Sequence, residues 1–242
     1  MTEKEEYRPR LNASEMELIK SRRLASENNV IVIGDLHEPF CLDEYFEYCL
    51  DMREKFNCGK TVFIGDIVDN HFSSYHESDP DGKSAGDELD QAISRIKRWH
   101  DAFPNAYVTI GNHDRLMMRK AFSSGISKRW IKDYKDVLET PTWRFVDEIE
   151  IHDVCYVHGE GGTARTRVKA ELQSVVQGHL HTQAYCEWTV GARNRCFAMQ
   201  VGCGIDRRAY AMAYAKTGKK PVIGCAVVLD SGRNPINLIM DL

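Results

Sequence analysis

Several features are scarce in this 242-residue chain, and each scarcity excludes a class of protein. Its eight cysteines form no CxxC pair and mostly lie inside apolar runs, which predicts buried free thiols in a reducing compartment. The longest apolar run, residues 221–229, is far shorter than the roughly 20 residues that cross a bilayer. The charged N-terminus, MTEKEEYRPR, lacks the apolar core of a secretory signal. We therefore expect a cytoplasmic protein that does not span a membrane.

Positive charge is not in excess either. The chain has 32 Lys plus Arg against 36 Asp plus Glu, so its formal net charge is -4 and any contact with a polyanion must be local. Its 43% hydrophobic and 28% charged residues are typical of a folded soluble protein. No Gly/Ser/Pro-rich linker, repeat or low-complexity tract divides the chain. We predict a single domain over 30–242, preceded by a helical arm or docked helix within 1–29.

Strand patterns and amphipathic helix patterns alternate through the first half of the chain, which predicts parallel strands joined by crossover helices. The elements expected there are a helix opened by the capping box Ser14-Glu15-Met16-Glu17, strands over 30–33, 61–64 and 106–110, and helices over 42–56, 87–103 and 116–138. The second half is richer in strand patterns. Its expected elements are a hairpin over 145–157, a helix over 163–172, and strands at 175–176, 185–190, 196–201, 222–229 and 236–240.

Three of the predicted strands end in the same way, with a Gly followed by a side chain that carries oxygen. The three segments are VIVIGD (30–35), TVFIGD (61–66) and YVTIGN (107–112). In an open α/β sheet, ligands bind beyond the carboxyl ends of the strands, and the Gly permits the sharp turn that directs the next side chain there. The three oxygen-bearing side chains are therefore expected to meet at one edge of the sheet.

Histidines follow the same rule. Five of the nine lie at predicted strand ends: His37, His113, His158, His179 and His181. A set of Asp, Asn and His side chains suits a pair of divalent first-row metal ions, and the absence of thiolates from it argues against a structural zinc site. One such residue alone is more often a satisfied polar group, but several in order favour a two-metal hydrolytic site. The remaining histidines are expected to be structural at 100 and 152, and either solvated or near a substrate at 71 and 76.

Five ordered blocks resemble the motifs of calcineurin-like metallophosphoesterases. They are GDLH (34–37), GDIVDN (65–70), GNHD (111–114), HG (158–159) and GHLH (178–181). Five blocks in order, spread over about three fifths of the chain, are far more specific than one short motif. The flanking segments SAGDEL (84–89) and 103–114 also resemble metallophosphoesterases of tailed bacteriophages. The resemblance implies an α/β fold with two mixed β-sheets packed between helices, a four-layer αββα sandwich.

The resemblance also implies a role for individual residues. It assigns seven ligands to two metal ions: Asp35, His37 and His181 to one, Asn112, His158 and His179 to the other, and Asp66 as a bridge between them. Two cations ~3.5–4 Å apart can produce a bridging hydroxide that attacks phosphorus in line with the leaving oxygen. His113 would donate a proton to the leaving group or stabilise its developing charge, and Asp69 would orient His113. Mn²⁺ is the expected ion, although Fe²⁺, Ni²⁺, Co²⁺ and Zn²⁺ suit the same ligands.

Two positions depart from the family pattern. Glu38-Pro39 follows the first motif where many relatives have Gly, and Asn70 stands where the family's serine/threonine protein phosphatases carry a phosphate-binding Arg. The second departure argues against a protein phosphatase of that subfamily. Candidates for a substitute cation are Arg115, Arg165, Arg167 and Lys169, although a solvated helix face is the better-supported interpretation of each.

Three other segments keep more than one interpretation. The polar segment 71–86 is long for a loop and either overhangs a site or is solvated. The run 216–220 lacks the leading Gly and final Ser/Thr of a phosphate loop. A third group could contact a nucleotide or another subunit through charge and stacking, or it could simply cover the core as a polar segment. Its members are Arg207, Arg208, Tyr210 and Tyr214.

The sequence therefore predicts a dinuclear metal-dependent phosphoester hydrolase acting on a small phosphomonoester or phosphodiester of the nucleotide type. Small phosphoesters rank ahead of long duplex DNA, because the net charge is -4 and no long capping insert is present. Two alternatives stay open. One is a metal-dependent nuclease acting on DNA or RNA, and the other is a non-catalytic metal-binding interaction module.

Overall fold

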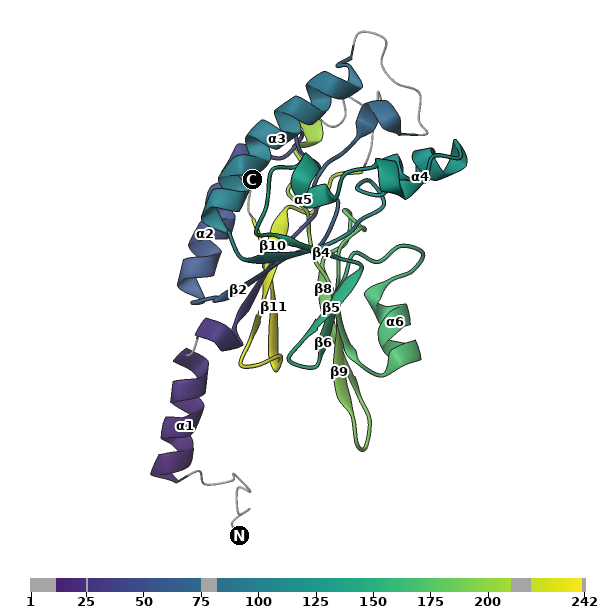
Figure 1. Ribbon diagram of the computed structural model, residues 1–242. Helices are drawn as coiled ribbons and strands as arrows, with labels where there is room; N and C mark the ends of the chain where they lie inside the picture. The colour runs from purple at the N-terminus through teal and green to yellow at the C-terminus, as the bar shows by residue number, and fades with distance from the viewer. Residues whose placement is uncertain (1–11, 25, 75–81, 210–218, 241–242) are drawn as a thin grey trace, which may run out of the picture.

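Strand β1 (Val30–Ile33) has apolar side chains on both faces, and all four are buried. Ile31 and Ile33 pack into an apolar cluster beneath helices, whereas Val30 and Val32 pack into a second cluster between two sheets. A strand covered on both faces has no polar side, which explains its uninterrupted apolar run. Figure 1 shows the computed structural model, which describes residues 12–24, 26–74, 82–209 and 219–240.

The first sheet has six strands in the order β11-β10-β1-β2-β3-β4. Its parallel part consists of β1, β2 (Lys60–Phe63), β3 (Ala106–Thr109) and β4 (Arg144–Val146). Two strands are added in antiparallel orientation, namely β10 (Gly224–Leu229) and β11 (Asn234–Ile239). Helices α2 (Asp43–Lys55) and α3 (Ala85–Ala102) connect β1 to β2 and β2 to β3. The predicted alternation of parallel strands and crossover helices is therefore confirmed.

The second sheet has five strands in the order β5-β6-β7-β9-β8. Their bounds are β5 (Glu148–Ile151), β6 (Val154–Val157), β7 (Ser174–Gln177), β8 (Tyr185–Val190) and β9 (Arg195–Gln200). Helix α6 (Ala164–Glu171) covers the outer face of this sheet through the buried side chains of Ala164 and Val168. In Figure 1, α2 and α3 lie on one side of the two sheets and α6 on the other. The predicted αββα fold of two mixed sheets is confirmed.

Three details of the predicted elements are wrong. The helix expected over 116–138 is divided into α4 (Leu116–Ser123), the 3-10 helix η3 (Lys128–Trp130) and α5 (Tyr134–Val137). Helix α4 ends because Gly125 adopts a φ of 70° and its neighbour Ile126 donates back to the Ala121 carbonyl at 2.8 Å. The strand expected from residue 145 to 151 also divides, since β4 belongs to the first sheet and β5 to the second.

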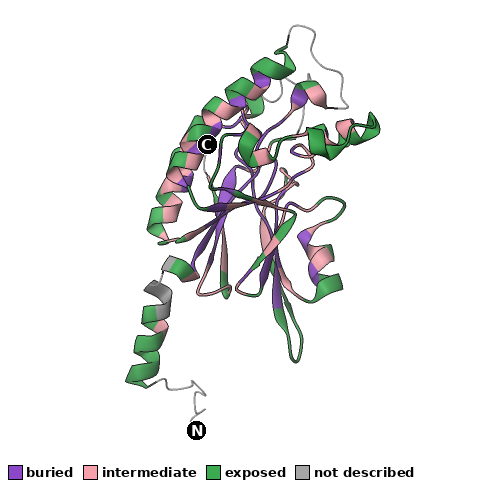
Figure 2. Ribbon diagram, viewed as in Figure 1, coloured by how far each residue is buried: buried purple, intermediate pink, exposed green. Residues whose placement is uncertain are grey.

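The third error concerns helix α1 (Ala13–Leu24), whose capping box begins two residues earlier than predicted. The Glu15 amide donates to Asn12 Oδ1, and the Asn12 amide donates to Glu15 Oε2, both at 2.8 Å. Figure 2 shows α1 exposed over most of its described length, away from the buried layers. The 3-10 helix η1 (Ser26–Asn28) leads from α1 into β1. A domain boundary at residue 30 stays a prediction.

All eight cysteines are free and six of them are buried, which confirms the predicted thiols. Among the described residues, no helix is long and apolar enough to cross a membrane.

Candidate metal centre

The carboxyl ends of strands from both sheets meet at one place. Asp35 follows β1, Asp66 follows β2, and both carboxylates are 1% exposed. His158 directly follows β6, and His179 follows β7 after a single glycine. Because parallel strands end at the same edge, residues far apart in the sequence come together here. All seven predicted metal ligands lie in this cluster.

The first group of candidate ligands consists of Asp35, His37, Asp66 and His181. His37 Nε2 lies 3.2 Å from His181 Nε2 and 3.5 Å from Asp66 Oδ2. His181 Nε2 also lies 3.1 Å from Asp35 Oδ2. Two imidazole nitrogens and two carboxylates thus point toward a common centre.

The second group lies on the other side of Asp66. His158 Nε2 is 3.2 Å from Asp66 Oδ2 and 3.0 Å from Asn112 Oδ1. The His179 ring centroid is 5.1 Å from that of His158, and ligand atoms of Asp66, His158 and His179 lie within 4.8 Å of one another. The Asp66 carboxylate therefore belongs to both groups of candidate ligands.

Hydrogen bonds fix the orientation of two imidazole rings. His37 Nδ1 donates to Asp69 Oδ1 at 2.6 Å, and His158 Nδ1 donates to the Ile64 carbonyl at 2.9 Å. Both acceptors require the proton on Nδ1, which leaves Nε2 to face the cluster. A ligating histidine is held in the same way when its second nitrogen donates to a carboxylate or carbonyl.

The backbone is left-handed at several positions around the cluster. His37, Asp66, Asn70 and His179 have φ values of 50°, 47°, 52° and 71°. Non-glycine residues adopt this region rarely, and such strain concentrates at functional sites when the surrounding fold enforces it. Here it directs side chains from the strand ends into one small volume.

Two glycines of the motifs are needed because side chains approach them closely. A Cβ on Gly111 would lie 2.0 Å from Asp66 Oδ1, and a Cβ on Gly178 would lie 2.3 Å from Asp35 Oδ1. The two carboxylates therefore occupy space that any larger residue would fill. This contact gives the Gly-Asn and Gly-His spacing of the motifs a direct physical reason.

Metal ions fit this set of residues. Asp35 Oδ1 is buried and accepts no hydrogen bond from any described residue, although a buried carboxylate oxygen normally has a partner. The donors are carboxylate, amide and imidazole groups without thiolates, which suits Mn²⁺ and its first-row neighbours. A cation beside Asp35 would compensate the unpartnered oxygen.

The family assignment agrees with this geometry. The sequence model of the calcineurin-like phosphoesterases matches residues 29–202. The chain belongs to the calcineurin-like phosphoesterase family. Family membership, together with the clustered Asp and His side chains, makes it a metal-dependent phosphoesterase. The resemblance to tailed-bacteriophage members stays a prediction.

Solved structures with a similar arrangement are remote in sequence. Vacuolar protein sorting 29 from Cryptosporidium parvum is 14% identical, with a TM-score of 0.45 over 88% of this chain and 91% of that one. The phosphoesterase Yfce from E. coli is 12% identical, with a TM-score of 0.42 over 83% and 87%. The nuclease MPE from Pseudomonas putida is 11% identical, with a TM-score of 0.38 over 87% and 86%. No functionally curated protein is significantly similar to the chain.

In this calcineurin-like phosphoesterase, the charges of Asp66 and His158 depend on each other. Burial alone would raise the pKa of Asp66, but the adjacent His158 lowers that pKa below its usual range. Burial would lower the pKa of His158, but Asp66 and Asp35 raise it to about 10. The protein without bound metal therefore holds a buried ion pair where a cation would replace the proton.

This ion pair predicts the pH dependence of stability in EDTA. The folded pKa of His158 is about 10 and its unfolded value is about 6.5, so its contribution to stability is complete below pH 6.5 and disappears as pH rises to 10. We expect the melting temperature of the wild type to fall over this range, and that of His158→Gln to fall less. Calorimetry at a series of pH values measures both, and parallel curves would contradict the ion pair.

His113 lies beside the first group, and its ring is held at one nitrogen. Its Nδ1 donates to the Asp69 carbonyl at 2.6 Å, and its backbone amide donates to Asp66 Oδ1 at 2.9 Å. Asn70 Nδ2 donates to the His113 carbonyl at 3.0 Å, so the residue at the protein-phosphatase Arg position supports His113. Asp69 thus contacts His113 through its backbone and His37 through its carboxylate.

Asp114 received no role from the sequence, although it is part of the third motif. It is 2% exposed, and its carboxylate accepts from the amides of Ile67 at 3.0 Å and Gly111 at 2.8 Å. Burial and the nearby Asp66 raise its pKa to about 6. Asp114 therefore joins the second and third motifs. Its position directly after Gly-Asn-His was the only available signal.

Glu38 is a second residue whose role the sequence did not reveal. It is fully buried directly after His37, and it forms a 2.5 Å ion pair with Arg95 of α3. Trp99 Nε1, also on α3, donates to Glu38 Oε1 at 3.1 Å. Burial raises the pKa of Glu38 although Arg95 opposes the shift. The Glu38 carboxylate therefore fixes the first motif to α3.

Replacing Trp99 by Phe removes one donor from the buried Glu38 carboxylate. We expect the free energy of unfolding to fall by about 1–3 kcal/mol, because one oxygen of a buried charged acceptor loses its hydrogen-bond donor, while Arg95 still contacts the other oxygen. Trp143→Phe is the matched control, since Trp143 is also buried but donates to the neutral Phe103 carbonyl at 2.8 Å. Urea denaturation measures both variants. Equal losses would show that the charge of Glu38 contributes nothing.

The candidate phosphate-binding cations are engaged elsewhere. Arg115 pairs with Asp147 at 2.8 Å and Glu160 at 2.7 Å. Arg165 and Arg167 lie on α6 and pair with acidic residues of the second sheet and of α6 itself. Lys169 is exposed on the same helix. The surface interpretation therefore fits all four better than contact with the metal centre.

The polar segment after the second motif is anchored at its start. The 3-10 helix η2 (His71–Ser73) donates two backbone amides to the buried carboxylate of Glu88, from His71 at 2.7 Å and Phe72 at 3.0 Å. His71 is buried rather than solvated. Residue 76 lies outside the described residues, as do Tyr210, Tyr214 and 216–218. Arg207 and Arg208 are exposed, and their predicted roles stay open.

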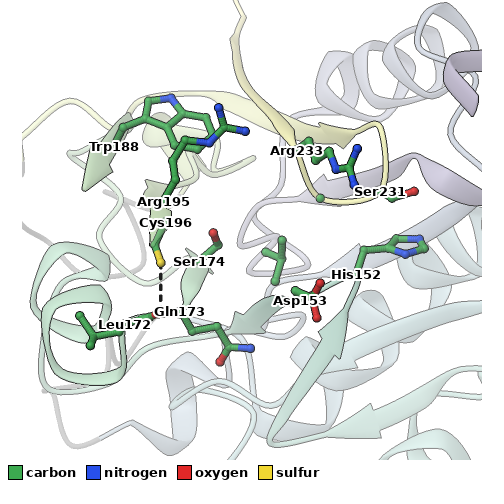
Figure 3. A pocket seen from close by; sticks show the side chains of 12 residues that line it. His152, Asp153, Leu172, Gln173, Ser174, Trp188, Arg195, Cys196, Ser231 and Arg233 are labelled. Carbon is green, nitrogen blue, oxygen red and sulfur yellow. Dashed lines mark hydrogen bonds between the residues drawn. The ribbon is translucent and has the colours of Figure 1, made fainter. Parts of the chain in front are cut away.

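A hollow of about 420 Å³ lies away from the metal centre (Figure 3). It is bounded by the β5–β6 turn, the β10–β11 turn and the residues that enter β7, which are the opposite strand ends. Figure 3 shows the Arg195 guanidinium beside Trp188, 5.0 Å from the ring centroid. The described lining includes none of the seven predicted ligands, so this hollow is separate from the candidate metal centre.

Proposed function

We propose that this chain is a dinuclear metal-dependent phosphoester hydrolase whose substrate is a phosphoester of the nucleotide type. The observation that carries the proposal is the position of Asp66, whose carboxylate lies between two groups of candidate ligands. A shared anionic oxygen is what two adjacent cations need to remain close together. Mn²⁺ is the expected ion, because the donors are oxygen and imidazole nitrogen.

Two bound divalent cations would supply Lewis acidity toward a phosphoryl oxygen and a nucleophile derived from water. The protein's own part is to hold the cations and the leaving group. His37 and His158 keep Nε2 directed inward because Nδ1 is occupied by a hydrogen bond. Asp35 and Asp66 contribute the negative charge that offsets the cations. No covalent intermediate with a protein side chain is required.

We assign to His113 the donation of a proton to the leaving oxygen. Burial would lower its pKa, but the charges of Asp66 and Asp69 raise it above the usual value, which favours the protonated form of the ring. The Asp69 carbonyl holds Nδ1, so Nε2 is the nitrogen that remains for the substrate. The ring is partly exposed, at 16%, as a group that meets a substrate must be.

A non-catalytic interaction module is the alternative that must be tested. Such a module would be expected to lack part of the machinery, whereas this chain carries all seven expected ligand residues and His113. The family assignment to phosphoesterases supports the enzyme as well. We therefore place hydrolysis first.

The test is hydrolysis of p-nitrophenyl phosphate and bis-p-nitrophenyl phosphate by metal-stripped protein, with Mn²⁺ added back. We expect metal-dependent turnover of at least one ester. Preference for the diester would direct the search to cyclic nucleotides and single-stranded nucleic acid, and preference for the monoester to nucleotides and small phosphorylated metabolites. Absence of turnover with Mn²⁺, Ni²⁺ and Co²⁺ would reject the proposal.

A further inference from the structure

Positive charge is concentrated directly after the third motif. Residues 115–132, here called the basic segment, contain six basic side chains and no acidic one, in a chain with a formal net charge of -4. The six are Arg115, Arg119, Lys120, Lys128, Arg129 and Lys132. Arg115 is paired with Asp147 and Glu160, so the local positive field that the whole-chain charge conceals comes from the other five.

The same segment exposes two aromatic rings. Phe122, near the end of α4, is 85% exposed, and Trp130, in η3, is 86% exposed. Within the described part of the chain, no other large apolar side chain is exposed to this extent, the next being Val190 at 70%. Figure 2 shows α4 largely exposed at the margin of the protein. Exposed aromatic rings among basic side chains indicate a binding surface.

A groove of about 480 Å³ lies between α4 and η3. Its lining combines the apolar side chains of Phe122, Ile126 and Ile131 with the basic side chains of Arg119 and Lys128. A ligand that fits this groove must therefore offer negative charge and a flat apolar face together.

The basic segment begins at the candidate active site. Arg115 follows the third motif directly, and α4 starts at Leu116, three residues after His113. The eight residues of α4 extend for about 12 Å at 1.5 Å per residue. In Figure 1, α4 lies near α5, the element that follows η3. A polymer bound here would continue toward the leaving-group residue.

We propose that the basic segment binds single-stranded nucleic acid and directs its phosphodiester backbone to the metal centre. The inference rests on the proposed function for the cleavage step, but not for binding. Basic side chains would neutralise phosphates, and Phe122 and Trp130 would stack on bases.

Two other ligands agree less well with these observations. In a duplex the bases stack on each other and are not available to a protruding ring, so exposed aromatic residues favour unpaired strands. A membrane surface is usually met by one long amphipathic helix, whereas these side chains stand on an eight-residue helix and a three-residue 3-10 helix.

The test measures binding in EDTA, which stops hydrolysis, by fluorescence anisotropy of labelled oligo-dT and oligo-U of about 12 nucleotides. We expect Phe122→Ala/Trp130→Ala and Lys128→Ala/Arg129→Ala each to weaken binding by at least about tenfold. The matched control, Lys97→Ala/Arg193→Ala, removes the same charge from exposed positions on α3 and on the β8–β9 turn, and should bind as the wild type does. The two oligonucleotides distinguish DNA from RNA.

Tryptophan fluorescence gives an independent readout. Trp99 and Trp143 are buried, so Trp130 and Trp188 are the two exposed tryptophans. Quenching of tryptophan fluorescence by the oligonucleotide should persist in Trp188→Phe and disappear in Trp130→Phe. The Phe at position 130 still offers an aromatic ring for stacking, so this variant should lose the signal but not the binding.

Several outcomes overturn the proposal. The first is that the wild type binds neither oligonucleotide, and the second is that the control weakens binding as much as the test variants do. The third is that the test variants lose binding to anionic vesicles but keep their binding to oligonucleotides. Hydrolysis of bis-p-nitrophenyl phosphate is measured in parallel and should not change in any of these variants. If the wild type hydrolyses neither this diester nor p-nitrophenyl phosphate but still binds oligonucleotides, the proposed function is rejected and the binding surface stands.

Discussion

Asp66→Asn should reduce kcat/KM for the preferred aryl phosphoester by at least about a thousandfold. Asn keeps the size of the side chain but loses the negative charge that lies between His37 and His158, at 3.5 and 3.2 Å. Removing a single donor that stabilises transition-state charge already lowers kcat by about 10²–10³, and Asp66 serves both candidate cation positions. The assay is hydrolysis at saturating Mn²⁺, with metal content measured after desalting.

Metal content shows whether Asp66→Asn loses activity because it binds less metal or because its fold is damaged. If Asp66 bridges two ions, the variant should retain less than the wild-type amount of Mn²⁺ yet remain folded, because its neighbours keep their other hydrogen bonds. The matched control is Asp153→Asn, which makes the same change at an exposed hairpin position far from the cluster. Normal activity in Asp66→Asn would reject the bridging role and, with it, the dinuclear proposal.

The ligand cluster was predictable because each ligand is encoded next to the strand that positions it. A buried run such as Val-Ile-Val-Ile specifies a strand locally, and the Gly-Asp that follows places a carboxylate at its end. Once parallel pairing is assumed, Asp35 and Asp66 must lie at one edge. The order of strands and helices predicted only the parallel strands with crossover helices, whereas the four-layer arrangement was implied by the resemblance of the five motifs to the family.

The supporting contacts were not predictable, because they join residues whose proximity depends on tertiary packing. Glu38 and Arg95 are 57 positions apart, and nothing in either local sequence indicates that α3 carries the partner of a buried carboxylate. The division of the helix predicted over 116–138 was missed because its cause is local and its sequence signal is weak. A single Gly125 within a helical pattern is often tolerated, and only its left-handed φ of 70° ends α4.

Replacing His113 by Gln should affect esters according to their leaving groups. A proton donor contributes about 10²–10⁴-fold where the leaving oxygen is strongly basic, and little where it departs as a stable anion. We expect kcat for phenyl esters to fall within this range, and kcat for p-nitrophenyl esters to fall less than about tenfold. His113 belongs to neither of the ligand groups that contain Asp66, but it forms a third possible ligand group with His37 and Asp69. If His113 is a proton donor, Mn²⁺ content should stay at the wild-type level, whereas loss of Mn²⁺ would identify it as a ligand.

The pH profile distinguishes proton donation from a merely structural role of His113. Because neighbouring carboxylates raise its pKa, the ring is protonated below that pKa, and activity toward phenyl esters should decline as pH rises through it. His113→Gln should lose this alkaline decline, whereas His152→Gln, a histidine on a distant turn that contacts the Glu27 carbonyl, should keep it. Equal losses for both leaving groups with an unchanged profile would mean that the His113 ring only supports the neighbouring backbone through its hydrogen bond to the Asp69 carbonyl.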